Sequence, residues 1–171
     1  VRGAFATQEA WDRGYTDNWL QSTGIHVASP RTTDFTQLLG NYVENSGQGF
    51  DIHSDHVIIA QNIVRDTMVG MKAIHGSRNV LILGNQFSQN DLWSIAVHPG
   101  RSSHAASPAQ GDQPAREANV DGGSIVANNI ISDFGYGHAH WMRPGDAHGI
   151  PIRFEAGQKA HNPPLTDVII Q

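Results

Sequence analysis

Five short segments of the sequence end in a histidine or an arginine that directly follows an apolar residue. They read Gly24-Ile-His26, Phe50-Asp-Ile-His53, Lys72-Ala-Ile-His75, Ile95-Ala-Val-His98 and Ile150-Pro-Ile-Arg153. Asp51 stands two residues before His53, so in an extended strand both side chains point to the same side. An imidazole can accept or donate a proton near neutral pH, and a guanidinium can bind a carboxylate through two hydrogen bonds. These groups suit proton-transfer chemistry on an anionic substrate.

The same alignment of segments places Lys72 opposite Phe50 and Ile95, at a position expected to face the interior. Lysine is rarely buried without a partner. Either a corner of the fold lets the ammonium group reach solvent, or partial desolvation lowers the pKa of Lys72 and makes it a better base.

An asparagine recurs along the chain, each time after a short apolar strand and one residue before another apolar residue. The positions are 41, 62, 85 and 129, at intervals of 21, 23 and 44. A histidine-ended segment follows the first three asparagines after about a dozen residues. We therefore predict a repeat of about 22 residues, with one longer interval that contains an insertion. We interpret the asparagines as a turn ladder, in which each amide bonds the backbone and the asparagine of the next repeat.

Strands this short cannot bury their faces alone, but strands stacked in parallel share one continuous core. The repeat is too short for a propeller blade and lacks the regular leucines of a leucine-rich repeat. We predict an all-β chain that forms a right-handed parallel β-helix of about four to five coils over residues 24–171. In this reading Ile52, Ile74, Val97 and Ile152 face the interior, and His26, His53, His75, His98 and Arg153 form one outer row.

Three parts of the chain depart from the repeat. Residues 1–23 are expected to form a cap or loop, and two surface insertions span Pro99–Asp121 and Phe134–His148. The second insertion contains Tyr136 and Trp141, and both insertions flank the histidine-ended strands, so they could wall a cleft. Because a stack that ends in mid-coil exposes a sheet edge, we expect further coils beyond Gln171.

The composition excludes several classes of protein. The net charge is −5 and no basic run is present, which argues against nucleic acid as a partner. The chain has no cysteine, so it has neither disulfides nor thiolate metal sites. No run of 18 apolar residues exists, so no membrane span is expected. A secreted, periplasmic or cell-surface location is the expectation, with no signal peptide in this chain.

The asparagine-punctuated coils from about Gly24 to Gln171 resemble the right-handed β-helix repeats of pectate-lyase-like proteins. Gly49-Phe-Asp51-Ile-His53 also resembles the Gly-Phe-Asp-Pro-His segment of alginate C5-mannuronan epimerases. This second resemblance implies that Asp51 and His53 are catalytic, with His75 where the epimerases carry a further Asp. The chain departs from the epimerases at Ile52, which replaces Pro, and at Gln48, which replaces the catalytic Tyr. Tyr136 could substitute for that Tyr.

The favoured function is a polysaccharide lyase or C5-epimerase-like enzyme that acts on a uronate-containing polysaccharide. A base would remove the C5 proton, a cation would stabilise the charge on the carboxylate, and an acid would complete the reaction. The expected catalytic residues are Asp51, His53, His75 and Lys72. The expected substrate-binding residues are His26, His98, Arg153, Tyr136 and Trp141.

Three alternatives stay open. The first is a non-catalytic β-helix, such as an adhesin, a phage fibre or a surface binding module, in which the histidines form a solvated ladder. The second is a histidine metal site completed by His138, His140 or His148. The third is a glycoside hydrolase that uses Asp51 and Asp55. No metal ligand is assigned, and the cofactor considered is a divalent cation.

Overall fold

The structure is a computed structural model, and it describes residues 1, 23–28, 32–73, 77–98, 106, 108–112, 114–115, 122–135, 150–154 and 165–171. Within these residues every regular element is a β-strand. One sheet contains β1 (Thr23–Val27), β3 (Tyr42–Ile52), β5 (Ile63–Ala73), β7 (Gln86–Val97), β9 (Ile130–Phe134) and β10 (Ile150–Phe154). The other contains β2 (Gln37–Leu39), β4 (Ile58–Ala60), β6 (Leu81–Leu83), β8 (Ile125–Ala127) and β11 (Ile169–Ile170). We call them the long-strand sheet and the short-strand sheet.

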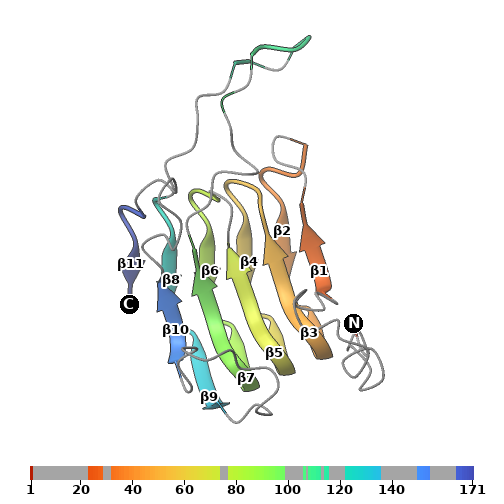
Figure 1. Ribbon diagram of the computed structural model, residues 1–171, viewed down its shortest axis with the longest axis vertical. Helices are drawn as coiled ribbons and strands as arrows, with labels where there is room; N and C mark the ends of the chain where they lie inside the picture. The colour runs from red at the N-terminus through yellow and green to blue at the C-terminus, as the bar shows by residue number, and fades with distance from the viewer. Residues whose placement is uncertain are drawn as a thin grey trace, which may run out of the picture.

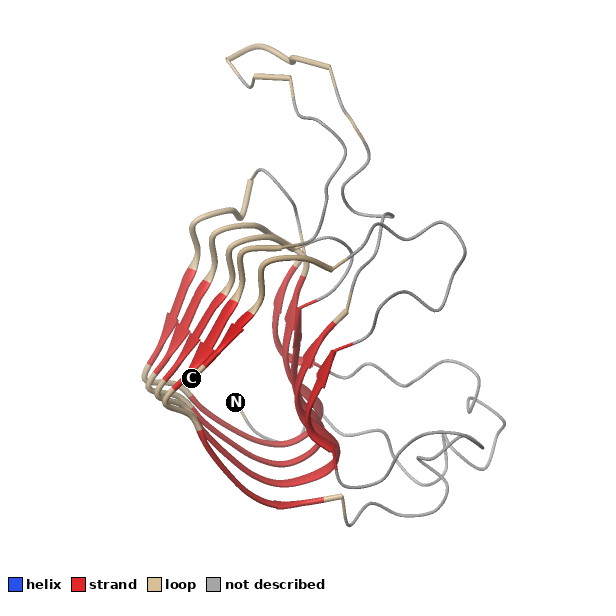
Figure 2. Cartoon of the chain, turned by 90° about the vertical axis from the view of Figure 1, so that its left-hand side faces the viewer, coloured by secondary structure: helices blue, strands red, loops and turns tan. Residues whose placement is uncertain are grey.

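The chain passes from one sheet to the other and back, and one such passage is here called a circuit. The long-strand sheet has the order β1-β3-β5-β7-β10 and the short-strand sheet the order β2-β4-β6-β8-β11, and all strand pairs are parallel. Figure 1 shows the strands of successive circuits side by side, and Figure 2 shows the two sheets enclosing a common interior. The prediction of an all-β chain with short parallel strands stacked circuit upon circuit is confirmed.

The last circuit of the long-strand sheet is made of two strands instead of one. β9 pairs with the first part of β7 and β10 with its last part. Together they therefore take the place that β3, β5 and β7 each hold alone, with residues 136–149 between them. The predicted insertion Phe134–His148 falls at this break. The other predicted insertion spans Pro99–Asp121. Its described residues, which lie between 106 and 115, are found beyond the ends of the strands (Figure 2).

The larger of two apolar clusters forms the interior, and both sheets contribute matching rows to it. One row from the long-strand sheet is Phe50, Met71 and Ile95, and its neighbour is Ile52, Ala73 and Val97. The facing row from the short-strand sheet is Ile59, Ile82 and Val126. All of these side chains are at most 2% exposed. Since full burial of such a side chain contributes roughly 1.5–3 kcal/mol, the rows supply the main force that holds the circuits together.

The asparagine ladder predicted from the sequence is present at the turn that precedes each long strand. Asn62 Oδ1 accepts hydrogen bonds from the backbone N–H and the Nδ2 group of Asn41, at 2.8 and 2.9 Å. Asn85 Oδ1 does the same for Asn62, and Asn129 Oδ1 for Asn85. Asn62 Nδ2 also donates to the carbonyl of Leu38, one circuit earlier. The ladder therefore satisfies buried polar groups at this turn and ties each circuit to its neighbours.

In the part of the chain that the structure describes, the circuits turn at the same three places through a left-handed backbone conformation. Residues with positive φ recur at 40, 61, 84 and 128, at 45, 66, 89 and 133, and at 35, 56, 79 and 123. Each series has the intervals of the asparagine ladder. Most of these residues are Gly, Asn, Asp or Gln, and Gly, Asn and Asp are the types that adopt this conformation at the lowest cost. These corners give all circuits one cross-section (Figure 2).

The predicted register of the histidine-ended segments is wrong by one or two residues in several circuits. Lys72 lies opposite Asp51 and Ala96, not opposite Phe50 and Ile95. The residue that shares an interior row with Ile52 is Ala73, and Phe154, not Ile152, completes that row beyond Val97. The cause lies in spacing, because β5 follows β3 at an interval of 21 and β7 contains one extra residue next to Asn90.

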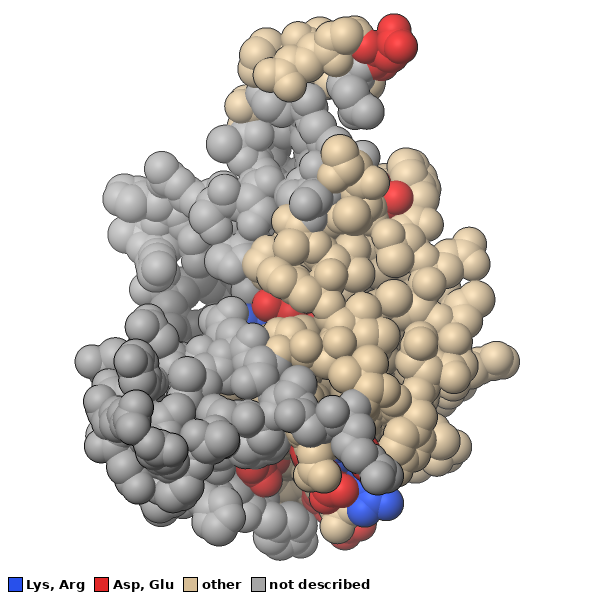
Figure 3. Space-filling model, turned by 90° about the vertical axis from the view of Figure 1, so that its right-hand side faces the viewer, with Lys and Arg blue, Asp and Glu red and all other residues tan. Residues whose placement is uncertain are grey.

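Part of the sequence-based interpretation lies outside the described residues. This holds for residues 2–22 of the expected cap, and for Ile74, His75, Tyr136, His138, His140, Trp141 and His148. The described residues include no helix long and apolar enough to cross a membrane. On the face shown in Figure 3, charged side chains of the described part are sparse and gather mainly near the lower edge, where acidic and basic groups lie together.

Candidate acid–base site

Asp51 is the centre of the polar cluster on the outer side of the long-strand sheet. The register places it between His26 of β1 and Lys72 of β5, in a row that continues through Ala96 to Arg153. Its neighbours Phe50 and Ile52 both belong to the apolar interior. The two core residues thus fix the strand on either side of Asp51, and the stacking of circuits brings residues 25 and 21 positions away beside it.

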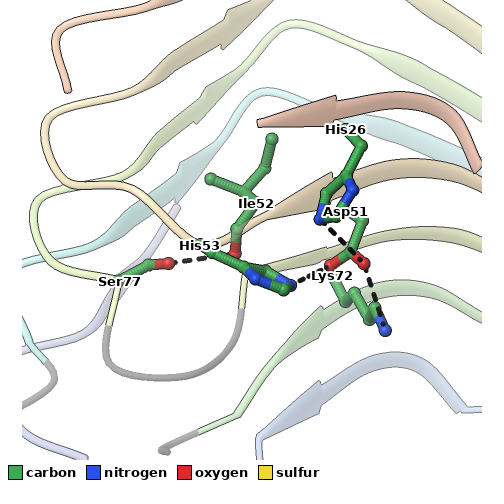
Figure 4. Close-up of polar contacts among 6 residues, drawn as sticks. All are labelled: His26, Asp51, Ile52, His53, Lys72 and Ser77. Carbon is green, nitrogen blue, oxygen red and sulfur yellow. Dashed lines mark hydrogen bonds and ion pairs between the residues drawn. The ribbon is translucent and has the colours of Figure 1, made fainter. Parts of the chain in front are cut away.

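Three cationic or titratable groups converge on the Asp51 carboxylate. His53 Nε2 lies 3.0 Å from Oδ1, Lys72 Nζ lies 3.4 Å from Oδ2, and His26 Nε2 lies 3.7 Å from Oδ2 (Figure 4). The Asp51 side chain is 1% exposed, whereas those of Lys72, His53 and His26 are 11%, 16% and 46% exposed. A large substrate could therefore reach the two imidazoles, but it could not reach the carboxylate directly.

The charge balance of the cluster favours an ionised carboxylate. Burial by itself raises the pKa of Asp51, but the His53 hydrogen bond and the Lys72 ammonium outweigh it, so the pKa lies below its ordinary value. Burial lowers the pKa of Lys72, although Asp51 opposes the shift. Burial also lowers the pKa of His26, again against the attraction of Asp51. An ionised carboxylate only accepts hydrogen bonds, so His53 Nε2 carries a proton when it bonds to Asp51.

A second group of side chains lies further along the same sheet, on β7 and β10. The Trp93 and His98 rings meet edge to face, with centroids 5.4 Å apart, and the Arg153 guanidinium carbon lies 4.3 Å from the Trp93 ring centroid. Arg153 over an aromatic face is a cation–π contact. Burial, with the positive charges of Arg153 and Lys72, lowers the pKa of His98 to about 4. His98 is therefore a neutral imidazole near pH 7.

Of the five residues predicted to share one outer row, the four that the structure describes occupy two adjacent rows, and His75 lies outside the described residues. His26 and Arg153 belong to the row of Asp51 and Lys72. His53 and His98 follow Ile52 and Val97, one residue further along the strands, and their backbone N–H groups donate to the carbonyls of Val27 and Ala73. His26 and His53 still touch, with ring centroids 4.8 Å apart, because the two rows are neighbours. The prediction of a single row was wrong.

Asp55 is held by the neighbouring circuit in a way that weakens the hydrolase alternative. Arg78 donates through its backbone N–H to Asp55 Oδ1, at 2.9 Å, and through Nη2 to Oδ2, at 2.8 Å. The Asp55 backbone N–H in turn donates to Asp34 Oδ1. Asp55 is 2% exposed, and its carboxylate is bonded to Arg78 of the neighbouring circuit, so it is not presented to a substrate.

Trp93 is the site residue that the sequence analysis did not single out. It stands two residues before Ile95, and its register partner is Val69 of β5. An aromatic residue on the outer side of a strand, in the segment that leads to His98, is a signal the sequence does contain. Strict alternation from the buried Ile95 would instead place Trp93 on the inner side, so the pattern of the sequence did not point to it.

Comparison with known proteins gives no relative of this chain. No family model, no curated protein and no solved structure matches it.

Proposed function

We propose that this chain is a right-handed parallel β-helix of the pectate-lyase-like kind. Successive circuits follow the same order in both sheets, and the paired strands within each sheet are parallel. Connections between parallel strands are almost always right-handed. The asparagine ladder and the repeated left-handed corners support a solenoid with one cross-section in every circuit.

We further propose that the chain is a lyase or C5-epimerase-like enzyme that acts on a uronate-containing polysaccharide at the Asp51 cluster. The observation that supports this most strongly is the 3.0 Å hydrogen bond between His53 and the buried Asp51, with Lys72 on the other carboxylate oxygen. A buried carboxylate that orients an accessible imidazole is a common arrangement for general acid–base catalysis. Asp51 would position His53 and keep its proton on Nε2, so proton exchange with substrate would involve Nδ1.

In the proposed reaction His53 takes the proton from C5 of the uronate, and the electrons of that C–H bond move toward the carboxylate. Lys72 and Arg153 supply positive charge for the resulting enolate-like intermediate. In a lyase the bond between C4 and its oxygen then breaks, and that oxygen receives a proton as the C4–C5 double bond forms. In an epimerase a proton returns to C5 from the opposite face. Both reactions begin with the same step.

The test compares the wild-type chain with the His53→Gln and His56→Asn variants on alginate and on polygalacturonate. His56 is an exposed histidine whose ring stacks on Phe35, so it controls for the loss of an imidazole elsewhere. A lyase produces ultraviolet-absorbing unsaturated ends, and an epimerase incorporates deuterium at C5 in D₂O. We expect His53→Gln to lower the rate by at least ~100-fold, because a general base contributes that much, and His56→Asn to leave it unchanged.

Full activity in the His53→Gln variant would eliminate the assignment of the base. If the wild-type chain formed neither product, the enzymatic proposal would be contradicted. Binding to the same polysaccharides without turnover would then indicate a non-catalytic binding module.

A further inference from the structure

Three groups of the kind that bind metal ions face one another at the Asp51 cluster. His26 Nε2, His53 Nε2 and a carboxylate oxygen of Asp51 all lie within 4.8 Å of one another. The two Nε2 atoms lie 3.0 and 3.7 Å from the carboxylate oxygens that they approach. The imidazoles come from two circuits and meet edge to face, with both Nε2 atoms directed at the same carboxylate (Figure 4).

This combination of ligands suits a divalent transition metal. Imidazole nitrogen and carboxylate oxygen bind Zn²⁺ at about 2.0–2.2 Å, so ligand atoms around one ion lie roughly 3–3.5 Å apart. Small side-chain rotations would bring the three groups to that spacing. We propose that His26, Asp51 and His53 form a binding site for a divalent transition metal ion such as Zn²⁺. Three protein ligands leave at least one coordination position open, and the 46% exposed His26 lies on the solvent side of the site.

Lys72 sets the geometry of this site. Its Nζ lies 3.4 Å from Asp51 Oδ2, so it holds the side of the carboxylate away from His53. His26 also approaches Oδ2 and His53 approaches Oδ1, so an ion bound to Oδ1 requires His26 to turn toward that oxygen. Lys72 then acts as an outer partner that orients the ligating carboxylate. Its positive charge also opposes the ion, so the affinity is lower than that of a site without it.

Metal binding and the acid–base function use the same atom in different ways. The ion needs the lone pair of His53 Nε2, so the ring proton must lie on Nδ1. The proposed proton transfer needs the reverse, with the proton on Nε2 and bonded to Asp51. The two states are mutually exclusive. The metal site follows from the geometry alone and does not rest on the proposed enzymatic activity.

The test uses the full chain, treated with EDTA and dialysed, and titrated with Zn²⁺ by calorimetry and with Co²⁺ by visible absorption spectroscopy. We expect saturable binding of one ion by the wild-type chain, with cobalt bands that report nitrogen and oxygen ligation. His26→Gln and His53→Gln should each weaken binding at least 10-fold, whereas His56→Asn should leave it unchanged. Lys72→Met should strengthen it. Circular dichroism checks that each variant is folded.

Absence of saturable binding would overturn the site. So would equal affinity in the wild-type chain and in folded His26→Gln and His53→Gln variants, because the ion would then bind elsewhere. Since no polysaccharide is present, failure of the enzymatic proposal would leave this result unaffected.

Discussion

At the scale of single residues, the site is organised around a buried carboxylate and not around its histidines. Asp51 is almost fully buried, yet it contacts an imidazole on each side and an ammonium group. A buried charge is stabilised only when it is paired, so each partner of Asp51 is held in place by that requirement. The residue types of this cluster could be predicted from the sequence, because Asp51, His53 and Lys72 all stand out there. The central place of Asp51 could not, since it depends on the register between circuits.

His98 should make stability depend on pH. Its pKa is about 4 in the folded chain, against an ordinary value of 6.5, so protons bind the unfolded chain more readily. Above pH 6.5 His98 is neutral in both the folded and the unfolded chain, so the free energy of unfolding is not reduced by its protonation. As the pH falls from 6.5 toward 4, the free energy of unfolding declines by roughly 1.4 kcal/mol per pH unit before screening. We expect wild type to lose ~2–3 kcal/mol more over this window than His98→Gln. Urea unfolding at several pH values measures the difference, and identical pH profiles would refute the assignment.

At the scale of the elements, the turns were predictable and the long strands were not. The asparagine series marks a turn that every circuit repeats, because an asparagine there satisfies groups in its own circuit and in the next. The long strands lack such a marker. Phe50-Asp-Ile-His53 and Lys72-Ala-Ile-His75 look alike in sequence, but the hydrogen bonds pair Asp51 with Lys72. Similarity of side chains therefore misled the alignment by one residue, and the extra residue in β7 added to the error.

An interior rung of the ladder should matter more than a terminal one. Asn62 is 1% exposed and both accepts hydrogen bonds from Asn41 and donates to Leu38 and Asn85. Asn41 lies at the start of the ladder, where it donates to Asn62 and, at 3.4 Å, to the carbonyl of Leu39, and it is more exposed than Asn62. We expect Asn62→Ala to lower the free energy of unfolding by ~2–4 kcal/mol, because buried polar groups lose their partners, and Asn41→Ala by about 1 kcal/mol. Thermal or urea unfolding measures both. Equal losses would show that the ladder does not stabilise the stack cooperatively.

At the scale of the whole molecule, stacking turns a distance along the chain into a contact. His26, Asp51 and Lys72 are separated by 25 and 21 residues, yet they occupy consecutive strands of one sheet. The repeat interval could be predicted from the sequence, and with it the parallel architecture. Which residue of each circuit meets which could not, because a one-residue change in strand length moves a side chain into another row. The site is therefore a property of the stack and would not survive in an isolated circuit.

The central claim is that Asp51 and Lys72 face each other across neighbouring circuits. A double-mutant cycle tests it most directly, with the free energy of unfolding measured for wild type, Asp51→Asn, Lys72→Met and the double variant. We predict a favourable coupling energy of about 1–3 kcal/mol, because each single change leaves a buried partner unsatisfied. A control cycle with Asp66→Asn and Lys72→Met, whose positions lie well apart on β5, should be additive within ~0.5 kcal/mol. Additivity of the Asp51 and Lys72 changes would contradict the register on which the site depends.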